Sequence, residues 1–423
     1  FWLKSIWASH ALRPPLGRRR AACAWPPMAP APATPWLHAL RAGDAEALRP
    51  LLAAALRVDS VGTVKLQQAA GERFTGGHST PVWRLSFSAS RGDKVKDTQL
   101  VCKWIRFPSD RPEWVEWRFA TYSNEQAFYT EAAPGLRKKC RLPHMLATER
   151  CKTDICFVFE DISVEFPLHP DCLSTPAAHA VLRWLAGFHA HFWEADAAGS
   201  GFPPGMCTNG DYWGLSKRDN EASLQNVASN LLLSQKVLKA HGAWDAVKSL
   251  GARLVAAAHA LDGHLRRTKG FVRHRTLIHG DFKTANLFLR EGKGGDFEAV
   301  VLDFEMTGPG LAAVDLAYFL FPDLRMNLLE QEDALIRYYH AALEERLDEL
   351  GAGSGFPLET LAAHYAAARC DHFRYLLARG WTAVTAGDVA AVLRVEEDMR
   401  RFDGGRALSG EEYDAAVAAA FHD

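Results

Sequence analysis

A carboxylate, an ammonium group and an amide lie close together in the second half of this 423-residue chain. Asp281, Lys283 and Asn286 all belong to the segment LIHGDFKTAN, residues 277–286. A second carboxylate, Asp303, lies at the end of a predicted short strand. Carboxylate and amide oxygens are ligands that suit Mg²⁺, and an ammonium group neutralises phosphate charge. These residue types at this spacing indicate a site that holds Mg-ATP and orients an attacking hydroxyl.

Each of these side chains has a predicted role, because phosphoryl transfer depends on in-line positioning and on charge neutralisation. Asp281 is placed to accept the proton of an attacking hydroxyl, or a hydrogen bond from it. Asn286 and Asp303 offer oxygens to Mg²⁺, and Lys283 could reach the γ-phosphate. The sequence therefore predicts a phosphotransferase that uses ATP and Mg²⁺, with Asp281 as its catalytic base.

The specificity of this signal comes from the combination of its parts. His-Gly-Asp alone occurs by chance in many chains, and a polar loop with a helix cap at Asp281 would explain it. That alternative does not explain why an asparagine lies five residues after the aspartate and why a later strand ends in Leu-Asp-Phe.

Two further segments fit a nucleotide site. Gly76 and Gly77 precede the first strand of a predicted hairpin, where glycines let backbone amides approach phosphates, although paired glycines between strands are more often only a turn. Glu160 ends an apolar strand, and backbone groups from Glu160 to Ile162 would meet the adenine edge. The alternative for that segment is a strand with an exposed acidic end.

Lys103 is the predicted phosphate-binding lysine of the small lobe. It lies on the predicted strand 99–105, on the side of the nucleotide, and Glu125 on the following helix could pair with it to position the α- and β-phosphates. Glu116 and Glu131 are competing partners. A lone strand lysine usually faces solvent, so this assignment depends on the downstream motif.

The predicted elements form two lobes. Alternating residues in 81–88 and the apolar run 99–105 predict an antiparallel hairpin, with 90–98 turning the chain between them. A helix is predicted over 113–132, ending at Pro134. Further elements are predicted as follows: helices at 44–57 and 176–193 and within 220–268, strands at 155–159, 276–279, 287–289 and 298–303, and about four helices after 328.

This order predicts an α+β fold with a small antiparallel β-rich nucleotide-binding lobe, residues 36–161, and a larger helical lobe, residues 162–423. Nucleotide sites commonly lie in the crevice between two such lobes. Residues 1–35 are predicted to lie outside the fold. They are rich in proline and arginine, and indicate either a transit peptide or translated upstream sequence before Met28; we favour the second reading.

The overall composition excludes several classes of protein. The 49 basic and 50 acidic residues nearly cancel, which indicates no long-range attraction to nucleic acid. The eight cysteines include no Cys-x-x-Cys pair, which favours reduced thiols over a zinc site. No apolar run approaches the roughly 18 residues needed to span a bilayer. We expect a cytoplasmic protein; the sequence does not indicate its oligomeric state.

Taken together, these motifs resemble the aminoglycoside phosphotransferase and choline kinase superfamily, and most closely its ecdysteroid kinase-like branch. The resemblance covers roughly residues 70–380 and implies a bilobal protein-kinase-like fold, ATP, Mg²⁺ and a small-molecule hydroxyl as acceptor. The segments that carry it are Asn124–Tyr129, Val158–Ile162, Trp184–Ala190, Leu277–Asn286, Val301–Glu305 and Asp315–Leu320.

The resemblance also assigns roles residue by residue. It implies that His279 and Asp315 mainly order the two loops, and that His189 is a core histidine. The residues that it carries into the nucleotide, metal and catalytic roles given above are Lys103, Glu125, Asp281, Asn286 and Asp303.

Three departures from protein kinases argue against a protein substrate. Gly280 stands where His-Arg-Asp would have arginine, and Glu305 stands where Asp-Phe-Gly would have glycine. Only the segment 304–314 separates Asp303 from Asp315, which leaves little room for a regulated activation segment.

Glu305 raises a hypothesis of its own. If the strand continued through it, Glu305 would share a face with Asp303 and could contact a second metal or a cationic substrate. The alternative is a surface or salt-bridged carboxylate.

The acceptor pocket is expected between residues 205–230 and the carboxy-terminal helices. Their aromatic and imidazole side chains could line it or could be ordinary core. The sequence leaves choline, ethanolamine, a sterol, a sugar, an antibiotic and a hydroxy acid open as acceptors. A nucleotide-binding pseudokinase or scaffold is the alternative function, followed by a protein kinase. The side chains in question are His364, Tyr365, His372, Phe373, Tyr375 and Trp381.

Overall fold

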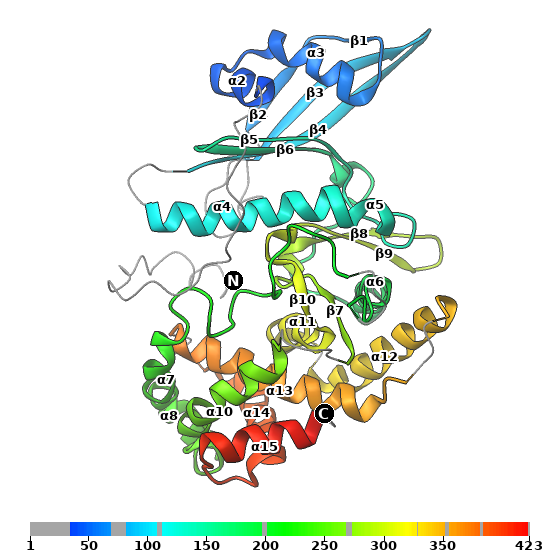
Figure 1. Cartoon of the computed structure of the whole chain (residues 1–423). Helices are drawn as coiled ribbons and strands as arrows, with labels where there is room; N and C mark the ends of the chain where they lie inside the picture. The colour runs from blue at the N-terminus through cyan, green and yellow to red at the C-terminus, as the bar shows by residue number, and fades with distance from the viewer. Residues whose placement is uncertain are drawn as a thin grey trace.

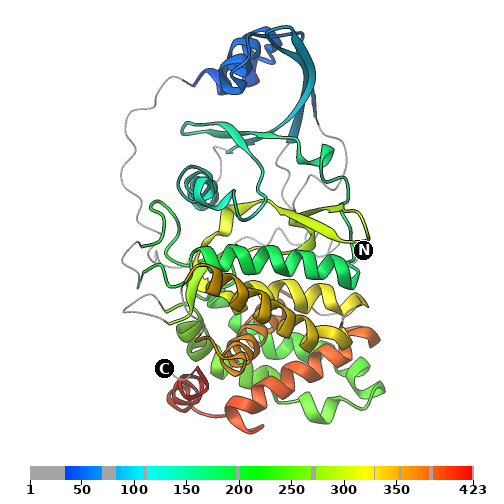
Figure 2. The ribbon, with the colours of Figure 1, turned by 90° about the vertical axis from the view of Figure 1, so that its right-hand side faces the viewer.

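The computed structural model describes residues 34–68, 82–107, 112–196, 201–267, 273–327, 329–351, 355–380 and 384–421. The chain has a bilobal α+β architecture, with a curved antiparallel sheet in the small lobe and a helical large lobe (Figure 1). The long helix α4 (Pro112–Ala127) lies between the sheet and the strands of the large lobe (Figure 2).

The small-lobe sheet is antiparallel throughout, in the order β1-β3-β4-β6-β5, with β2 also pairing with β3. Strand β5 was missed in the sequence. The strands are β1 (Ser60–Val61), β2 (Lys65–Gln68), β3 (Val82–Arg91), β4 (Lys94–Arg106), β5 (Met145–Arg150) and β6 (Asp154–Glu160).

The predicted hairpin is β3 and β4, but its turn is shorter than predicted. The strands pair up to Arg91 and Lys94, so only Gly92 and Asp93 turn the chain. The prediction that residues 90–98 form the turn was wrong. Gly92 has a φ of +56°, a conformation that a tight two-residue turn requires and that glycine adopts without strain.

The two faces of the sheet are covered by different helices. Helices α2 (Pro35–Ala42) and α3 (Ala45–Leu56) pack on one face, where Leu48 and Leu52 meet alternate strand residues such as Cys102. Helix α4 covers the other face, which carries the residues of opposite parity. Lys103 therefore points from β4 towards α4 and the large lobe.

The helix after β4 runs further than predicted. A π-helical turn (Phe128–Ala132) follows α4, and α5 (Ala133–Leu136) follows that turn. The prediction that Pro134 ends the helix was wrong. Pro134 lies in the first turn of α5, where its missing N–H costs no intrahelical hydrogen bond.

The large lobe holds two small strand pairs among its helices. Strand β7 (Arg275–Ile278) pairs with β10 (Gly308–Leu311), and β8 (Leu287–Glu291) pairs with β9 (Phe297–Val301). None of the described helices combines the length and apolar character needed to cross a bilayer. The longer helices are α6 (Thr175–His191), α10 (Leu250–Leu265), α11 (Ala312–Asn327), α12 (Glu332–Glu349), α13 (Leu358–Ala378), α14 (Val389–Asp403) and α15 (Gly410–Phe421).

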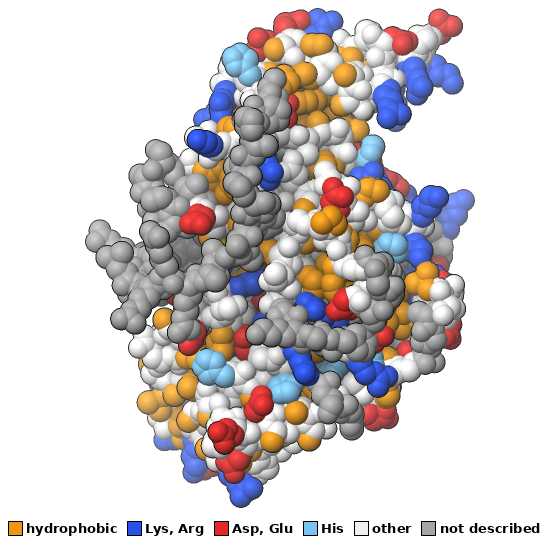
Figure 3. Space-filling view, in the orientation of Figure 1, with side chains coloured by type: hydrophobic (Ala, Val, Ile, Leu, Met, Phe, Trp, Pro, Cys, Tyr) orange, Lys and Arg blue, Asp and Glu red, His pale blue; other side chains and the backbone are white. Residues whose placement is uncertain are grey.

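Between α6 and α10 the chain is only partly helical. The short helices α7 (Val227–Leu233), α8 (Gln235–Ala240) and α9 (Trp244–Val247) follow a loop. Backbone hydrogen bonds from Gly210 and Asp211 hold this loop against the segment that contains Met306 and Pro309. Figure 3 shows both acidic and basic side chains on each lobe of the face that it draws.

Candidate active site

The turn between β7 and the predicted catalytic residues requires glycine. Gly280 has a φ of +80°, and a Cβ at this position would lie 2.3 Å from the carbonyl oxygen of Met306 and 2.4 Å from the backbone nitrogen of Asp211. Both neighbours are backbone atoms, so they cannot move aside as a flexible side chain would. This packing explains why glycine stands before Asp281.

A buried carboxylate at the start of α11 anchors this turn. Asp315 accepts hydrogen bonds from the backbone N–H groups of His279, at 2.7 Å, and Gly280, at 2.8 Å. It also accepts one from Nε2 of His189 at 3.1 Å. Because Asp315 is fully buried, these N–H groups compensate for the cost of removing the carboxylate from water.

His279 links the catalytic turn to the segment that carries Asp303. Its Nε2 donates to the carbonyl oxygen of Leu302 at 3.1 Å, while its Nδ1 accepts from the backbone N–H of Asp281 at 3.2 Å. This pair of bonds requires a neutral imidazole. Burial favours the same form, since it lowers the pKa of His279.

Two polar side chains of the segment 277–286 donate hydrogen bonds to the carboxylate of a third residue, Asp281. Asp281 accepts hydrogen bonds from Nζ of Lys283, at 2.9 and 3.1 Å, and from Nδ2 of Asn286 at 3.1 Å. Burial alone would lower the pKa of Lys283, but the neighbouring Asp281 raises it, so the lysine stays cationic. Nδ2 of Asn286 also donates to the carbonyl oxygen of Asp281, which leaves Oδ1 as the side-chain atom that suits a metal.

The backbone brings Asn286 and Asp303 side by side. Leu287 pairs with Val301 across the β8–β9 ladder, and the N–H of Leu302 donates to the carbonyl oxygen of Asn286 at 3.1 Å. The predicted strand 298–303 is wrong at its end, because β9 stops at Val301 and Asp303 takes a left-handed conformation with a φ of +72°.

Lys103, on strand β4 of the small lobe, contacts Asp303. Its Nζ lies 2.7 Å from Oδ1 of Asp303 and 2.8 Å from Oε2 of Glu125. The competing partners Glu116 and Glu131 are exposed. The contact with Lys103 thus joins strand β4, helix α4 and the segment after β9.

One ammonium group stands between two carboxylates here, and the two acids respond differently. Burial works against ionisation of Asp303, but Lys103 outweighs it and lowers the pKa of Asp303 to about 2. Burial dominates at Glu125, where the pKa rises to about 7 despite Lys103. At neutral pH Asp303 is therefore an anion.

These donors fit a divalent cation. The anionic carboxylate of Asp303 and Oδ1 of Asn286 are hard oxygen ligands, and Mg²⁺ is usually held by one or two protein carboxylates together with substrate phosphates. Within the described part of the chain there is no cluster of three or more His, Cys, Asp or Glu residues that could hold a metal by itself. A metal at this point would therefore depend on the nucleotide for further ligands.

Glu305 does not share a face with Asp303, contrary to the hypothesis drawn from the sequence. Residues Phe304–Met306 form a 3₁₀ turn rather than a strand. The carboxylate of Glu305 is buried and faces α4, where Arg118 Nη1 lies at 3.5 Å and Thr121 Oγ1 at 3.4 Å. The salt-bridged alternative is confirmed.

The remaining predicted nucleotide contacts lie at the lobe junction or outside the described residues. The N–H of Glu160 donates to the carbonyl oxygen of His144, and the carbonyl oxygen of Ile162 accepts from Phe166. An adenine edge would therefore have to use other backbone groups of this segment. Gly76 and Gly77 lie outside the described residues.

Two tyrosines near the carboxylate of Asp281 were missed in the sequence. The hydroxyl groups of Tyr212 and Tyr318 lie 2.6 Å apart, and both side chains are buried. Burial raises the pKa of each, and the negative charge of Asp281 raises it further. The two residues are over 100 positions apart, and no local motif marks them.

Of the aromatic candidates, only some lie near this pair. The ring centroid of Tyr375 is 5.6 Å from that of Tyr212. The ring centroid of His372 is 5.0 Å from that of Tyr318. Tyr365 and Phe373 are buried in the helical core. Trp381 lies outside the described residues.

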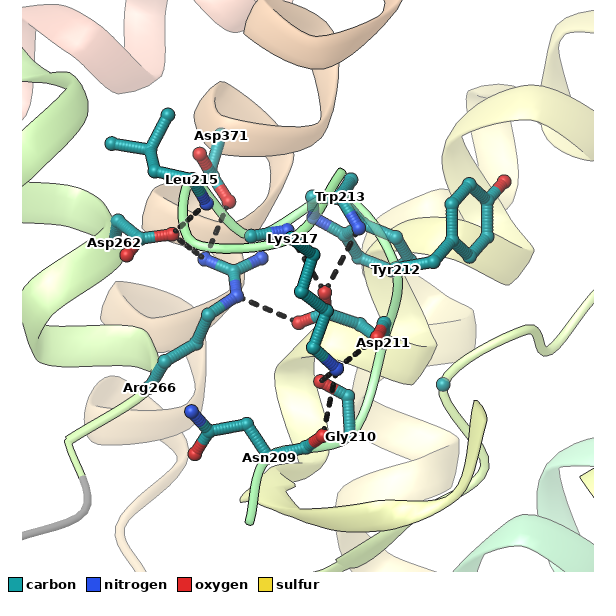
Figure 4. Close-up of polar contacts among 12 residues, drawn as sticks. Asn209, Gly210, Asp211, Tyr212, Trp213, Leu215, Lys217, Asp262, Arg266 and Asp371 are labelled. Atoms are coloured by element: carbon teal, nitrogen blue, oxygen red, sulfur yellow. Dashed lines mark hydrogen bonds and ion pairs between the residues drawn. The ribbon is translucent and has the colours of Figure 1, made fainter. Parts of the chain in front are cut away.

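A buried arginine fixes the loop that carries Tyr212. Arg266 bonds to Asp211 at 2.7 Å, Asp371 at 2.8 Å and Asp262 at 3.0 Å (Figure 4). The carboxylate of Asp211 also accepts the backbone N–H groups of Trp213 and Gly214. Next to it, the N–H of Asp211 donates to the carbonyl oxygen of Met306, so the loop lies directly against the segment after Asp303.

Solved structures of several small-molecule kinases resemble this fold at low sequence identity. A microcompartment-associated aminopropanol kinase is 14% identical, with 85% of this chain and 99% of that chain covered and a TM-score of 0.42. An aminoglycoside phosphotransferase from Alicyclobacillus acidocaldarius is 14% identical, with 85% and 92% covered and a TM-score of 0.39. Amicoumacin kinase, in complex with AMP-PNP and Ca²⁺, is 10% identical, with 86% and 95% covered and a TM-score of 0.41.

No curated protein matches the sequence significantly. The sequence does match the ecdysteroid kinase-like family over residues 76–352, which is more than half of the chain. That stretch includes the catalytic segment, both predicted metal ligands and the Lys103–Glu125 pair. The chain belongs to the ecdysteroid kinase-like family.

Proposed function

We propose that this protein transfers the γ-phosphate of ATP, with Mg²⁺, to a hydroxyl group of a small molecule, and that Asp281 is the catalytic base. The observation that carries the proposal is the convergence of Lys103, Asp281, Asn286 and Asp303 from three separate segments. Membership of the ecdysteroid kinase-like family makes the chain a small-molecule kinase.

The proposed mechanism follows from what each side chain offers. Bound Mg²⁺ would neutralise phosphate charge and orient the phosphates. Asn286 Oδ1 and Asp303 would hold it, and Lys103, kept in place by Glu125, would contact the α- and β-phosphates. Asp281 would accept the proton of the acceptor hydroxyl. Lys283, which contacts Asp281 now, would turn to the negative charge that develops on the transferred group.

The segment after Asp303 supports a small acceptor over a protein. Strand β10 begins at Gly308, only five positions on, and pairs with β7. Helix α11 follows directly from Ala312. A phosphorylated activation loop needs a longer segment than this connection provides. The pseudokinase alternative is disfavoured because the proposed base, metal ligands and phosphate-binding lysine are all present.

The experiment compares wild-type protein with Asp281→Asn. Asparagine keeps the size of the side chain but cannot take a proton. We expect phosphorylation of metabolites in a cell extract to fall by about 10²–10⁴-fold, while binding of Mg-ATP stays within about threefold. Equal activity of the two proteins would contradict the role of Asp281. Tight Mg-ATP binding without any phosphorylated metabolite would favour the pseudokinase.

A further inference from the structure

Three buried tyrosines lie near Asp281, on the side where we expect the acceptor to bind. Burial raises the pKa of Tyr212, Tyr318 and Tyr375, and the charge of Asp281 adds to the rise in each. All three therefore lie within electrostatic reach of the proposed base. Since the nucleotide would approach from the Lys103 side, these rings lie where an acceptor would enter.

One arginine, Arg218, contacts both an aromatic ring of this group and an aromatic ring of the small lobe. The Cζ atom of Arg218 lies 5.2 Å from the ring centroid of Tyr212 and 4.3 Å from that of Trp117 on α4. Its charge also acts on Tyr375, against that of Asp281. Cation–π contacts at exposed sites are weak individually, but two of them hold the guanidinium in a defined place.

Arg218 is exposed and has no acidic partner among the side chains that the structure describes. The neighbouring carboxylate, Asp219, pairs with Arg379 at 2.6 Å instead. By contrast, Arg118 and Arg266 nearby both face carboxylates. The N–H donors of Arg218 thus remain available to an anion from solution.

The backbone that presents Arg218 is fixed. Lys217, the residue before it, donates from Nζ to the carbonyl oxygens of Asn209, at 2.8 Å, and of Gly210 and Asp211 (Figure 4). Arg218 itself has a φ of +52°, which a non-glycine residue adopts only where surrounding contacts impose it. The guanidinium group of Arg218 therefore belongs to a loop whose conformation is stabilised by hydrogen bonds of Lys217 and Arg266.

We infer that Arg218 receives an anionic group of the acceptor, so that the substrate is an alcohol that also carries a carboxylate, sulfate or phosphate group. A guanidinium with free N–H donors binds such oxyanions in a bidentate manner, whereas it repels an amine. The aromatic rings beneath it would pack against the carbon skeleton between the anion and the hydroxyl. The inference rests on the proposed function and selects acidic alcohols, which include the hydroxy acids, over the aminoalcohol, aminoglycoside and neutral sterol classes.

The test begins with a cell metabolite extract that is divided by anion exchange, before ATP is added, into an anionic fraction and a fraction of neutral and cationic compounds. Each is incubated with the full-length protein and Mg-ATP, and mass spectrometry identifies compounds that gain one phosphate. We expect the products in the anionic fraction, and none with Asp281→Asn. Products confined to the neutral and cationic fraction would overturn the inference while the proposed function stands. No product in either fraction would overturn both.

Kinetics of variants then test Arg218 itself, with the compound identified in this way. Arg218→Gln should raise KM for the acceptor by at least about tenfold, with kcat and KM for ATP changed by less than about threefold. Arg218→Lys should recover part of the loss, because it keeps the charge. Arg91→Gln, at the exposed tip of the β3–β4 hairpin, is the matched control. An unchanged acceptor KM in Arg218→Gln would contradict the inference.

Discussion

Lys103 contacts both Glu125 and Asp303 directly, and the environments of the two acids separate their roles. Asp303 keeps its charge because Lys103 lies 2.7 Å away, whereas burial at Glu125 favours the protonated form. A permanent anion is what a metal ligand needs. Glu125 lies 2.8 Å from the ammonium group of Lys103, which suits a partner that positions the lysine.

Asp303 and Glu305 offer a matched pair of substitutions in one segment. Asp303→Asn should lower kcat/KM for ATP by at least about 10²-fold and raise the Mg²⁺ concentration at half-maximal activity, because the anionic ligand is lost. Glu305→Gln should leave that Mg²⁺ concentration within about twofold and destabilise the fold by about 1–3 kcal/mol, because Arg118 loses its carboxylate. Titration of activity with Mg²⁺ measures the first effect and urea denaturation the second. A larger metal effect in Glu305→Gln would reverse our assignment of the two acids.

The clustering of the polar residues in segment 277–286 could be predicted from the sequence because they lie within one short loop. Asp281, Lys283 and Asn286 are brought together by local backbone geometry alone. Tyr212 and Tyr318 could not be predicted, because tertiary packing brings them together and tyrosine at isolated positions is common in any core. The two alternatives for Glu305 stayed open because the end of β9, two residues before Asp303, has no clear sequence signal.

At the scale of elements, the start of α11 and the end of β7 act as one unit. Asp315, near the start of the helix, accepts both backbone N–H groups of the turn that leads into Asp281. The carboxylate also orients His189 on α6. Three elements thus meet at one buried side chain, and the position of the proposed base depends on it.

Asp315→Asn should separate this positioning role from simple stabilisation. The amide presents an NH₂ group where the N–H groups of His279 and Gly280 require an acceptor, which costs about 1–3 kcal/mol. We expect kcat to fall at least about tenfold and KM for ATP to change by less than about threefold. Steady-state kinetics below the unfolding temperature check this, with the exposed Asp348→Asn as control. Loss of stability with an unchanged kcat would limit Asp315 to a structural role.

Helices and strands could be predicted where hydrophobic periodicity is strong. They could not be predicted where a segment becomes a strand only because another strand pairs with it. Strands β3, β4 and β6 and the helices after 328 follow from their patterns. Strand β10 has the sequence Gly-Pro-Gly-Leu, which has little strand propensity, and it is extended because β7 pairs with it. Strand β5 was missed because its polar residues hide the alternation.

At the scale of the whole molecule, buried arginine clusters join the helices of the large lobe. Arg253 pairs with Glu396 and Asp403 on α14, and Arg369 on α13 pairs with Glu332 and Asp398. A third cluster, around Arg266, reaches the loop beside the active site through Asp211 (Figure 4). The packing of α10, α13 and α14 is thereby coupled to the loop that carries Tyr212 and Arg218.

Asp371, in the third cluster, should contribute to acid sensitivity. Burial opposes its ionisation, but Arg374 and Arg266 outweigh burial and hold its pKa below the usual value of 3.8. A lowered carboxyl pKa adds stability above the unfolded-state pKa, and that contribution disappears as pH falls through the folded-state pKa. The affected range therefore lies below about pH 4.

The check is chemical denaturation at pH 7, 4 and 3 of wild-type protein and Asp371→Asn. The variant should be less stable at pH 7 by about 3–5 kcal/mol, because two buried guanidinium groups lose their anion, and the difference should shrink at pH 3. Asp296→Asn, exposed in the β8–β9 connection, should follow the wild-type protein. A constant difference across all three pH values would show that the charge of Asp371 contributes nothing.

The central claim, transfer of phosphate from ATP to a small alcohol, is tested most directly by isotope transfer. Purified protein is incubated with a metabolite extract and Mg-ATP whose γ-phosphate carries ¹⁸O, and mass spectrometry follows the label. We predict that a metabolite gains one labelled phosphate with wild-type protein and that Asp281→Asn abolishes this gain. Label that appears only in free phosphate or on protein, with every metabolite unchanged, would contradict the account.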